Sequence, residues 1–505
     1  MCKYLVEHYP KLLHIIDNDG ETVLLCAARK GNVELFQLMI DKGLDASIRD
    51  KSGKTVLHWW CRNGDIQMCE YLINKYPHFL HLKDVEDENV LHEAAYGGNV
   101  IIFKLVTGKG INVFSKTKKG KTVLHQCCMN GMLNMCLYLL KHYPDLVKII
   151  DKEGETVLHD AAFGGNIDLL KCLIAKGLDE KSKTKKGKTV LHKCCMNGHL
   201  EMCKYLVKRY NDLVRSIDND GETVLHDAAW GGNVALFRFL INKGLDINRK
   251  TNKGKTVLHK CCLNGHLEMC KYLVKRYSNL VGSIDFEGKT VLHDAAFRGN
   301  VALFQFLINK GLDVKSKTKK GKTVLHMCCM NGKLAICKYL VNNHPELVDL
   351  TDNDEETVIH SAGVGDNVDL LKLLIAKGLP TDSKTRKGKT VLHKCCMTGK
   401  IQMCKYLVNN YQQLLTVQDN DGFNALHDTA IGGEVEIFKF LLEKGLDVHS
   451  KTGTGQTVLH LSCHVGKHMD GHVDKQAMFD YLIDSYPDLL NVGDNEAYQI
   501  KVLCT

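Results

Sequence analysis

Residues 189 to 203 read TVLHKCCMNGHLEMC, which places two histidines and three cysteines within fifteen residues. Thiolates and imidazoles are the ligands that zinc and copper prefer, so this composition is typical of a metal site. Related segments along the chain do not keep the set, however. Trp60 and Ser462 stand where the first cysteine should be, and Met478 stands where the third should be. A ligand set would not accept these residues, so we predict buried small hydrophobic side chains, with no metal and no cofactor.

The segment belongs to a unit that is repeated along the chain. The signature T-V-L-H, or a near relative of it, begins fourteen times, at intervals that alternate between 33 and 34 residues. The duplicated element is therefore a pair of units with 67 residues. The 33-residue B units begin at Thr22, Asn89, Thr156, Thr223, Thr290, Thr357 and Asn424. The 34-residue A units begin at Thr55, Thr122, Thr189, Thr256, Thr323, Thr390 and Thr457.

Each unit is predicted to form two helices and a hairpin-like finger. Threonine is a good N-cap, and the apolar residues that follow it recur at intervals of three and four. Gly198 separates the two helices of one A unit, and Gly311 is the expected C-cap of a B unit. The A units end instead with Tyr and often Pro, and turn-rich segments such as DNDGE and KTKKGK lead to the next unit.

This unit resembles the ankyrin repeat, which has a T-P-L-H-x-A-A helix, a glycine turn, a second helix and a finger. The resemblance implies an all-α ankyrin-repeat α-solenoid with short finger hairpins and about fourteen units. We predict that residues 1–21 are the second half of a truncated repeat, because MCKYLVEHY matches MCKYLVKRY at 202–210, and we expect a fragment of a longer array. Residues 22–490 are predicted to hold the fourteen repeats, with an eight-residue insertion near 467–474. Residues 491–505 are predicted to be a degenerate repeat start.

When positions are counted from the capping residue, the cysteines of A units occupy positions six, seven and fifteen. The B units have Ala, Ala and Phe or Leu there, which is a roughly volume-conserving exchange in a packed core. The resemblance implies that the histidine at position four bonds locally and to the neighbouring unit. His464, His468 and His472 are spaced by four, but Gly471 interrupts that segment, so a solvated loop is favoured over a metal site.

The recurring G-K-T triplet does not predict a nucleotide site. A phosphate-binding loop needs another glycine five residues before it, and no strand precedes the triplet. The residues at that place are Ser115, Ser182, Arg249, Ser316 and Ser383. We find no paired carboxylates and no nucleophile beside a base, so we predict that the chain is not an enzyme.

A row of apolar side chains at position eight is the candidate binding surface. If positions three, six and seven face inward, then positions five and eight lie on the opposite side of the first helix. Exposed aromatic and methionine side chains in a row are typical of an interface, although they would also fill gaps between adjacent first helices. The predicted concave row consists of Tyr96, Met129, Phe163, Met196, Trp230, Leu263, Phe297, Met330 and Met397.

Charge alternates along the array. Position five carries Asp160, Lys193, Asp227, Lys260 and Asp294 in successive units, and basic fingers alternate with acidic ones. Either this pattern fixes neighbouring units in register, or it forms a banded surface that selects an extended partner. Because the positive charges are interleaved with negative ones, we expect no nucleic acid.

The chain has 505 residues, a formal charge of +9 and twenty-two cysteines. The fraction of cysteine is below the roughly 8–10% that is typical of a disulfide scaffold. No segment has the form of a signal peptide or a membrane span, so we expect the cytoplasm, with the nucleus as a second compartment. The leading interpretation is a non-catalytic adaptor that binds protein partners, with a small molecule disfavoured. The alternatives are the ankyrin part of a larger membrane protein such as an ion channel, and a targeting subunit of an enzyme complex such as a ubiquitin ligase or phosphatase.

Overall fold

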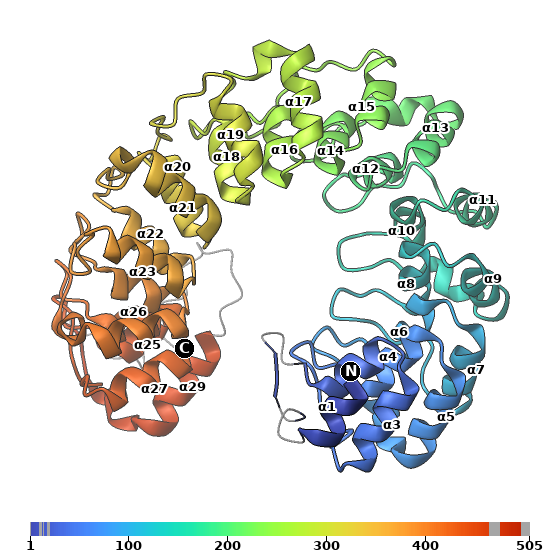
Figure 1. Cartoon of the computed structure of the whole chain (residues 1–505), viewed down its shortest axis with the longest axis horizontal. Coiled ribbons are helices and arrows are strands. Elements are labelled where there is room, and N and C mark those ends of the chain that lie inside the picture. Colours follow the sequence, from blue (N-terminus) through green and yellow to red (C-terminus); the bar gives the residue numbers. More distant parts are fainter. Residues whose placement is uncertain (1, 10–12, 14, 18–20, 464–474, 496–505) are drawn as a thin grey trace. The chain divides into compact units, whose positions relative to one another are not determined.

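The computed structural model describes residues 2–9, 13, 15–17, 21–463 and 475–495 of the chain. The chain divides into two compact halves, Met1–Asn252 and Lys253–Thr505, and each half is described by itself. Within each half, helices follow one another in pairs that are joined by short turns (Figure 1). No helix among the described residues is long and apolar enough to span a membrane.

The N-terminal half contains one helix before the first full unit and a pair of helices in each later unit. Its α-helices are α1 (Cys2–His8), α2 (Val23–Arg29), α3 (Val33–Asp41), α4 (Val56–Asn63), α5 (Ile66–Lys75), α6 (Val90–Gly97), α7 (Val100–Gly108), α8 (Val123–Met129), α9 (Leu133–His142), α10 (Val157–Gly164), α11 (Ile167–Ala175), α12 (Val190–Met196), α13 (Leu200–Arg209), α14 (Val224–Gly231) and α15 (Val234–Ile241).

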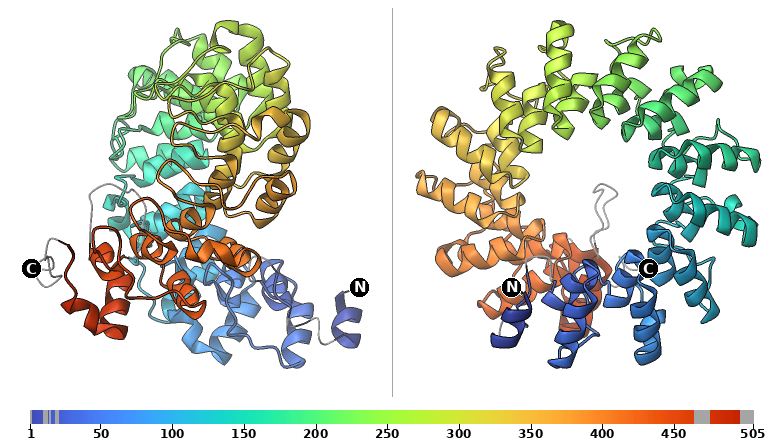
Figure 2. Two further views of the ribbon diagram at one scale, coloured as in Figure 1. Left: turned by 90° about the vertical axis from the view of Figure 1, so that its left-hand side faces the viewer. Right: turned by 45° about the vertical axis from the view of Figure 1, so that its right-hand side comes forward.

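The C-terminal half repeats the same arrangement. Its α-helices are α16 (Val257–Asn264), α17 (Leu267–Arg276), α18 (Val291–Arg298), α19 (Val301–Ile308), α20 (Val324–Met330), α21 (Leu334–Asn343), α22 (Val358–Val364), α23 (Val368–Ala376), α24 (Val391–Met397), α25 (Ile401–Asn410), α26 (Ala425–Gly432), α27 (Val435–Glu443), α28 (Val458–Cys463) and α29 (Lys475–Ser485). In both views of Figure 2, the two helices of a unit lie side by side. The all-α ankyrin solenoid predicted from the sequence is therefore confirmed within each half.

The two unit forms differ in how the second helix ends. In B units it ends before a glycine with positive φ, such as Gly311 at 86°, which only glycine adopts without strain. In A units a short 3-10 helix follows instead, and this turn accommodates the longer form. These 3-10 helices are η2 (Pro77–His81), η3 (Pro144–Lys148), η4 (Asn211–Arg215), η5 (Ser278–Leu280), η6 (Pro345–Leu347), η7 (Gln412–Thr416) and η8 (Pro487–Asn491).

The threonine and histidine of each T-V-L-H signature form the N-terminal cap of the first helix. In the unit that begins at Thr256, the Thr256 backbone N–H donates to His259 Nδ1 at 3.2 Å. The proton of that imidazole is therefore on Nε2, which donates to the carbonyl of Lys289 in the next finger at 3.2 Å. His326 Nε2 likewise donates to the carbonyl of Glu356 at 3.0 Å. The local and inter-unit bonding implied by the ankyrin resemblance is confirmed at these histidines.

Polar backbone contacts connect each unit to the one before it. The fingers form a ladder, in which Lys152 N–H donates to the Lys119 carbonyl and Lys185 N–H donates to the Glu153 carbonyl, both at 2.8 Å. Asn233, the N-cap of α15, donates from Nδ2 to the carbonyl of Gly198 in the preceding turn at 2.8 Å. The fingers are visible as loops beside α8 and α10 in Figure 1.

The cysteines at positions six, seven and fifteen of the A units lie in the core. Cys194, Cys195 and Cys203 are fully buried, as are their counterparts in the other A units that carry the complete set. The predicted insertion near 467–474, with His464, His468 and His472, lies outside the described residues, as does most of the segment 491–505. The continuity of residues 22–490 as one solenoid remains a prediction.

Candidate partner-binding surface

The predicted concave row at position eight is half-buried along most of its length. Phe297 is the exception, with 40% of its surface exposed. The intermediate members are Tyr96, Met129, Phe163, Met196, Trp230, Leu263, Met330 and Met397. The structure therefore gives each side chain two environments, one against a neighbouring helix and one against solvent.

The half-burial arises because adjacent first helices approach closely at this level. A Cβ atom on Gly164 in α10 would lie 2.5 Å from the carbonyl oxygen of Cys128 and 2.7 Å from that of Met129 in α8. Only glycine fits at such a distance, so Gly164 allows α10 to pack directly beside Met129. In the unit that begins at Thr290, Arg298 takes the place of this glycine, next to the exposed Phe297.

Side chains of the following unit hold the backbone of the row in place. Asn130 donates from Nδ2 to the carbonyl of Tyr96, and Asn197 donates from Nδ2 to the carbonyl of Phe163, both at 2.8 Å. The guanidinium of Arg62 lies 4.0 Å from the centre of the Tyr96 ring, so a cation covers one face of that aromatic side chain.

A hollow adjoins the row in the C-terminal half. It has a volume of about 450 Å³, and its apolar lining includes Phe286, Met327 and Met330. Lys319 and Lys320 line the same hollow from the finger that precedes α20. Phe286 is 58% exposed, so its ring is accessible at this hollow. The hollow thus combines apolar side chains with several ammonium groups and one carboxylate, that of Glu287, which is paired with Lys289.

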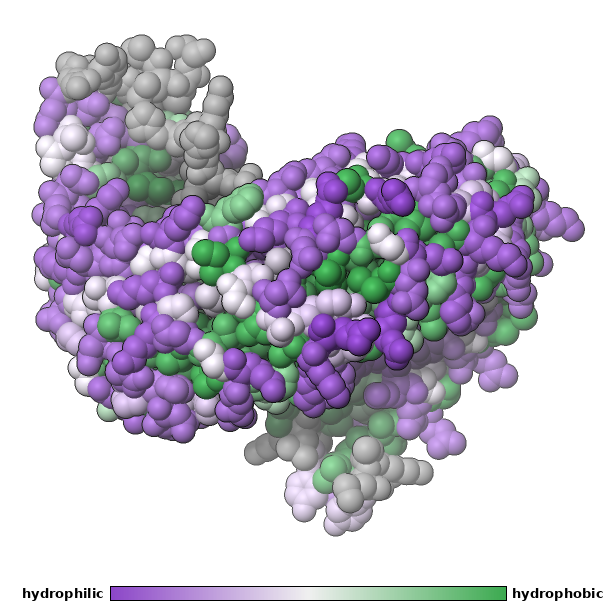
Figure 3. Space-filling model, turned by 90° about the horizontal axis from the view of Figure 1, so that it is seen from above, coloured by the Kyte–Doolittle hydropathy of each residue, from purple (hydrophilic) through white to green (hydrophobic). Residues whose placement is uncertain are grey.

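Figure 3 shows one face of the molecule, on which hydrophobic residues form patches separated by hydrophilic ones.

The prediction that position five is exposed is wrong for its acidic members. Asp160 and Asp227 are each 1% exposed and Asp294 is 3% exposed. Lys193 and Lys260 are half-buried. The reason is that first helices pack side by side, and each of these acids pairs with the lysine that precedes the first helix of the unit before it.

These carboxylates belong to buried ion clusters around the lysine of the G-K-T triplet. Lys188 Nζ lies 2.9 Å from Asp227 Oδ1, 3.0 Å from Asp218 Oδ2 and 3.1 Å from Glu222 Oε2. Asp218 and Glu222 belong to the finger that follows, so one lysine joins an A unit to the next B unit. The other lysines paired in the same way are Lys54, Lys121, Lys255, Lys322 and Lys389. Of the two interpretations of the charge pattern, these clusters support complementarity between neighbouring units.

Burial and charge shift the pKa values within a cluster in opposite directions. Burial raises the pKa of Asp160 to about 7, although Lys121 acts against this shift. Burial also acts to raise the pKa of Glu155, but Lys121 and Lys193 outweigh it and lower that pKa to about 2. A carboxyl with a pKa near 7 is suited to general acid or base catalysis, but one with 1% exposure cannot reach a substrate. The clusters are therefore structural.

A lysine–acid spacing in the sequence accompanies these clusters. A lysine immediately before the capping threonine recurs every 67 residues, and an acid at position five of the following B unit recurs with it, 39 residues later, at five of six places. Ser361 replaces the acid at the one remaining place. There, Lys322 is paired with Asp352 and Glu356 of the finger alone.

Comparison with known proteins agrees with this geometry. The profile of the family described as "Ankyrin repeats (3 copies)" matches residues 1–86, 91–184, 158–251, 246–318, 297–384 and 362–452. The chain belongs to the ankyrin-repeat family. Ankyrin repeats are in general non-catalytic modules for protein–protein interaction.

Several ankyrin-repeat relatives share part of this sequence. Notch-regulated ankyrin repeat-containing protein A of Danio rerio is 34% identical over 93 residues, which are 18% of this chain and 82% of that protein. Putative ankyrin repeat protein L371 of Acanthamoeba polyphaga mimivirus is 25% identical over 134 residues, or 26% of this chain and 16% of the viral protein. Human transient receptor potential cation channel subfamily A member 1 is 26% identical over 173 residues, or 32% of this chain and 15% of the channel. The chain thus spans a small part of the viral protein and of the channel.

Proposed function

We propose that this chain is a non-catalytic interaction scaffold that holds an extended protein segment along the position-eight row and the adjacent fingers. The observation that carries the proposal is the hollow beside Met330, where an exposed Phe286 and a half-buried row residue meet two finger lysines. An apolar anchor side chain followed by an acidic residue would fit this combination.

The proposal also concerns where the protein works. Twenty cysteines between Cys26 and Cys463 have free thiols, which supports a reducing compartment, and we propose the cytoplasm on that ground. The half-buried state of the row supports a scaffold that binds with a rigid surface, since each side chain is already held by the neighbouring unit.

The decisive experiment replaces Phe163, Trp230 and Phe297 with Ser and measures both binding and folding. Peptides selected from a random display library on the wild-type protein should lose binding to this variant, whereas the helical circular dichroism should be unchanged. The matched control replaces Ile101 and Leu137, which are exposed at 60% and 43% on the second helices α7 and α9, with Ser. The control should bind as the wild type does.

Two results would reject the proposal. If the triple variant loses its helicity, then the row serves packing between first helices. If it stays folded and still binds the selected peptides, then the segment is held elsewhere.

A second candidate is the ankyrin part of a larger membrane protein. The similarity to the human cation channel over 32% of this chain favours it. A full-length reading frame that encodes hydrophobic spans would support this candidate, and full-length transcripts without such spans would reject it.

A further inference from the structure

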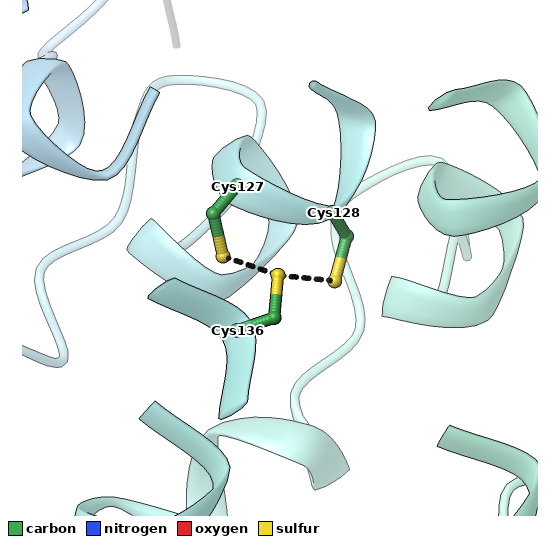
Figure 4. Close-up of side chains that lie close together, drawn as sticks. All are labelled: Cys127, Cys128 and Cys136. Atoms are coloured by element: carbon green, nitrogen blue, oxygen red, sulfur yellow. Dashed lines mark hydrogen bonds between the residues drawn. The ribbon is translucent and has the colours of Figure 1, made fainter. Parts of the chain in front are cut away.

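Three cysteine sulfurs come together in two of the A units. In the N-terminal half, Cys136 Sγ lies 2.9 Å from Cys127 Sγ and 3.7 Å from Cys128 Sγ, and Figure 4 shows the three side chains pointing toward one another. In the C-terminal half, Cys337 Sγ lies 2.9 Å from Cys328 Sγ and 3.7 Å from Cys329 Sγ. In each triad all three sulfurs lie within 4.8 Å of one another, and each side chain is fully buried.

The direction of the first thiol distinguishes these triads from those of other A units. Cys127 donates to the carbonyl of Leu124, one turn earlier in α8, at 3.3 Å. Cys194, its counterpart in the next A unit, donates to the carbonyl of His199 in the turn at 3.2 Å. The contact between the second and third sulfurs is more general, since Cys262 and Cys270 are 3.9 Å apart and Cys396 and Cys404 are 3.7 Å apart. In the two A units where the first thiol donates to a carbonyl of its own helix, all three sulfurs lie within 4.8 Å of one another.

The ligand set of a gathered triad suits a soft metal ion. It offers three sulfurs, and the metal-binding group around each triad contains no oxygen or nitrogen ligand among the described residues. Soft thiolate ligands favour Cu(I) over the hard cations. A structural zinc ion needs four ligands, so three sulfurs leave it incomplete.

Thiol hydrogen bonds join the triad internally. Cys136 donates to Cys127 Sγ, and Cys127 donates to the carbonyl of Leu124. The gathered geometry separates the two triads from the other A units, because only these two sets have all three sulfurs within 4.8 Å of one another among the described residues.

A second group of candidate metal ligands already holds a cation. The carboxylates of Asp84, Glu88 and Glu93 lie close together, but Lys54 Nζ is bound among them. An ammonium group neutralises that site, whereas no such group is bound to the sulfurs of the triads among the described residues.

We propose that the triads Cys127–Cys128–Cys136 and Cys328–Cys329–Cys337 are Cu(I) sites, each of which binds one ion through three cysteine sulfurs. The ion accepts lone pairs from the three sulfurs, and each thiol that becomes a thiolate ligand on binding releases its proton to water, so copper stays in the Cu(I) state. Because the sulfurs are fully buried, the ion enters through local opening of a helix pair, and binding is slow.

The test is a count of bound copper on the reduced full chain in oxygen-free buffer, titrated with Cu(I) against a chromogenic Cu(I) chelator. The wild type should bind two ions per chain, one for each gathered triad. Cys127→Ala with Cys128→Ala should bind one, and adding Cys328→Ala with Cys329→Ala should abolish binding. Alanine is the matched replacement, because five of the seven B units have Ala at both positions, as at Ala161 and Ala162.

The control variant is Cys194→Ala with Cys195→Ala, in a unit where the sulfurs are not gathered, and it should still bind two ions. A wild type that binds no copper, or one that binds five ions with equal affinity, would overturn the proposal. So would the loss of one ion in the control. X-ray absorption of the wild-type complex gives a readout that needs no variant, since three sulfur neighbours per copper support the proposal and two, four or any nitrogen or oxygen neighbours contradict it.

Discussion

The A and B units have the same fold but different chemistry at the same positions. Most A units have Cys, Cys and Cys where most B units have Ala, Ala and Phe or Leu, and these residues face the core. Six of the seven A units follow a lysine whose side chain is largely buried, and B units contribute the position-five acid that pairs with it at five of these six places. The interface from an A unit to the next B unit is therefore unlike the interface that follows it. The two unit forms thus share one backbone fold, whereas the volumes of their core side chains and the signs of their buried charges differ between neighbouring units.

The largest loss of stability is expected when the central lysine of an ion cluster is replaced. Lys188→Met leaves the carboxylates of Asp218, Glu222 and Asp227 buried without their partner, which costs about 3–5 kcal/mol of unfolding free energy. The measurement is urea unfolding followed by circular dichroism. Lys204→Met is the control, because its pair with Glu201 is largely exposed and contributes less than about 1 kcal/mol. Equal losses in the two variants would show that the clusters do not join the units.

The position-five acid of a cluster should make the stability of the protein depend on pH. Burial raises the pKa of Asp227 from 3.8 to about 7, although Lys188 opposes the shift. The folded state therefore holds more protons than the unfolded state between these values, and the contribution of Asp227 to stability falls as the pH rises from about 4 to about 7. The fall is at most about 1.4 kcal/mol per pH unit.

The difference in melting temperature between the wild type and Asp227→Asn, followed across this pH range, isolates that contribution. Buried histidines act in the opposite direction, because burial lowers pKa values such as that of His192 to about 4. These histidines are common to both proteins and cancel in the difference. A difference that grows in favour of the wild type as the pH rises would contradict the assignment.

The exchange of core volume is tested by giving an A unit the large residue of a B unit. Cys203→Phe places at position fifteen the side chain that Phe237 has in the following B unit, against Cys194 and Cys195, which are larger than alanine. Overpacking should cost about 1–3 kcal/mol. Adding Cys194→Ala and Cys195→Ala should restore most of this loss in chemical denaturation. A triple variant that is less stable than Cys203→Phe would show that the cysteines do more than fill volume.

The smallest expected effect concerns a polar contact between units. Asn197→Ala removes the bond from Asn197 Nδ2 to the carbonyl of Phe163 and should cost about 0.5–1 kcal/mol, because that carbonyl still has His199 Nε2 as a partner at 2.7 Å. Asn343 makes a bond of the same 2.8 Å length to Tyr339 within its own helix, and Asn343→Ala is the comparison. Hydrogen exchange of α10 and α12 should increase in Asn197→Ala alone. Unchanged exchange in both helices would mean that packing suffices there.

Periodicity accounts for what the sequence could predict. The capping threonines, the position-four histidines and the core cysteines repeat with the helices, so their environments follow from the 33- and 34-residue intervals. The burial of Asp160 could not be read in this way, because its partner Lys121 lies 39 residues away and a charged residue on a helix normally faces water. The gathering of Cys127 with Cys136 depends on the rotamer of one thiol, which the identical letters in neighbouring A units do not distinguish.

The ladder of fingers has a consequence for how such a chain can change in length. Each finger donates a backbone N–H to the finger before it and accepts one from the finger after it, so the ladder has a direction. A newly duplicated pair of units would find a donor at one end and an acceptor at the other, both already in place. An added pair of units can therefore join the ladder through the same backbone hydrogen bonds that its neighbours use, and its stability would come from interfaces of the two kinds already present.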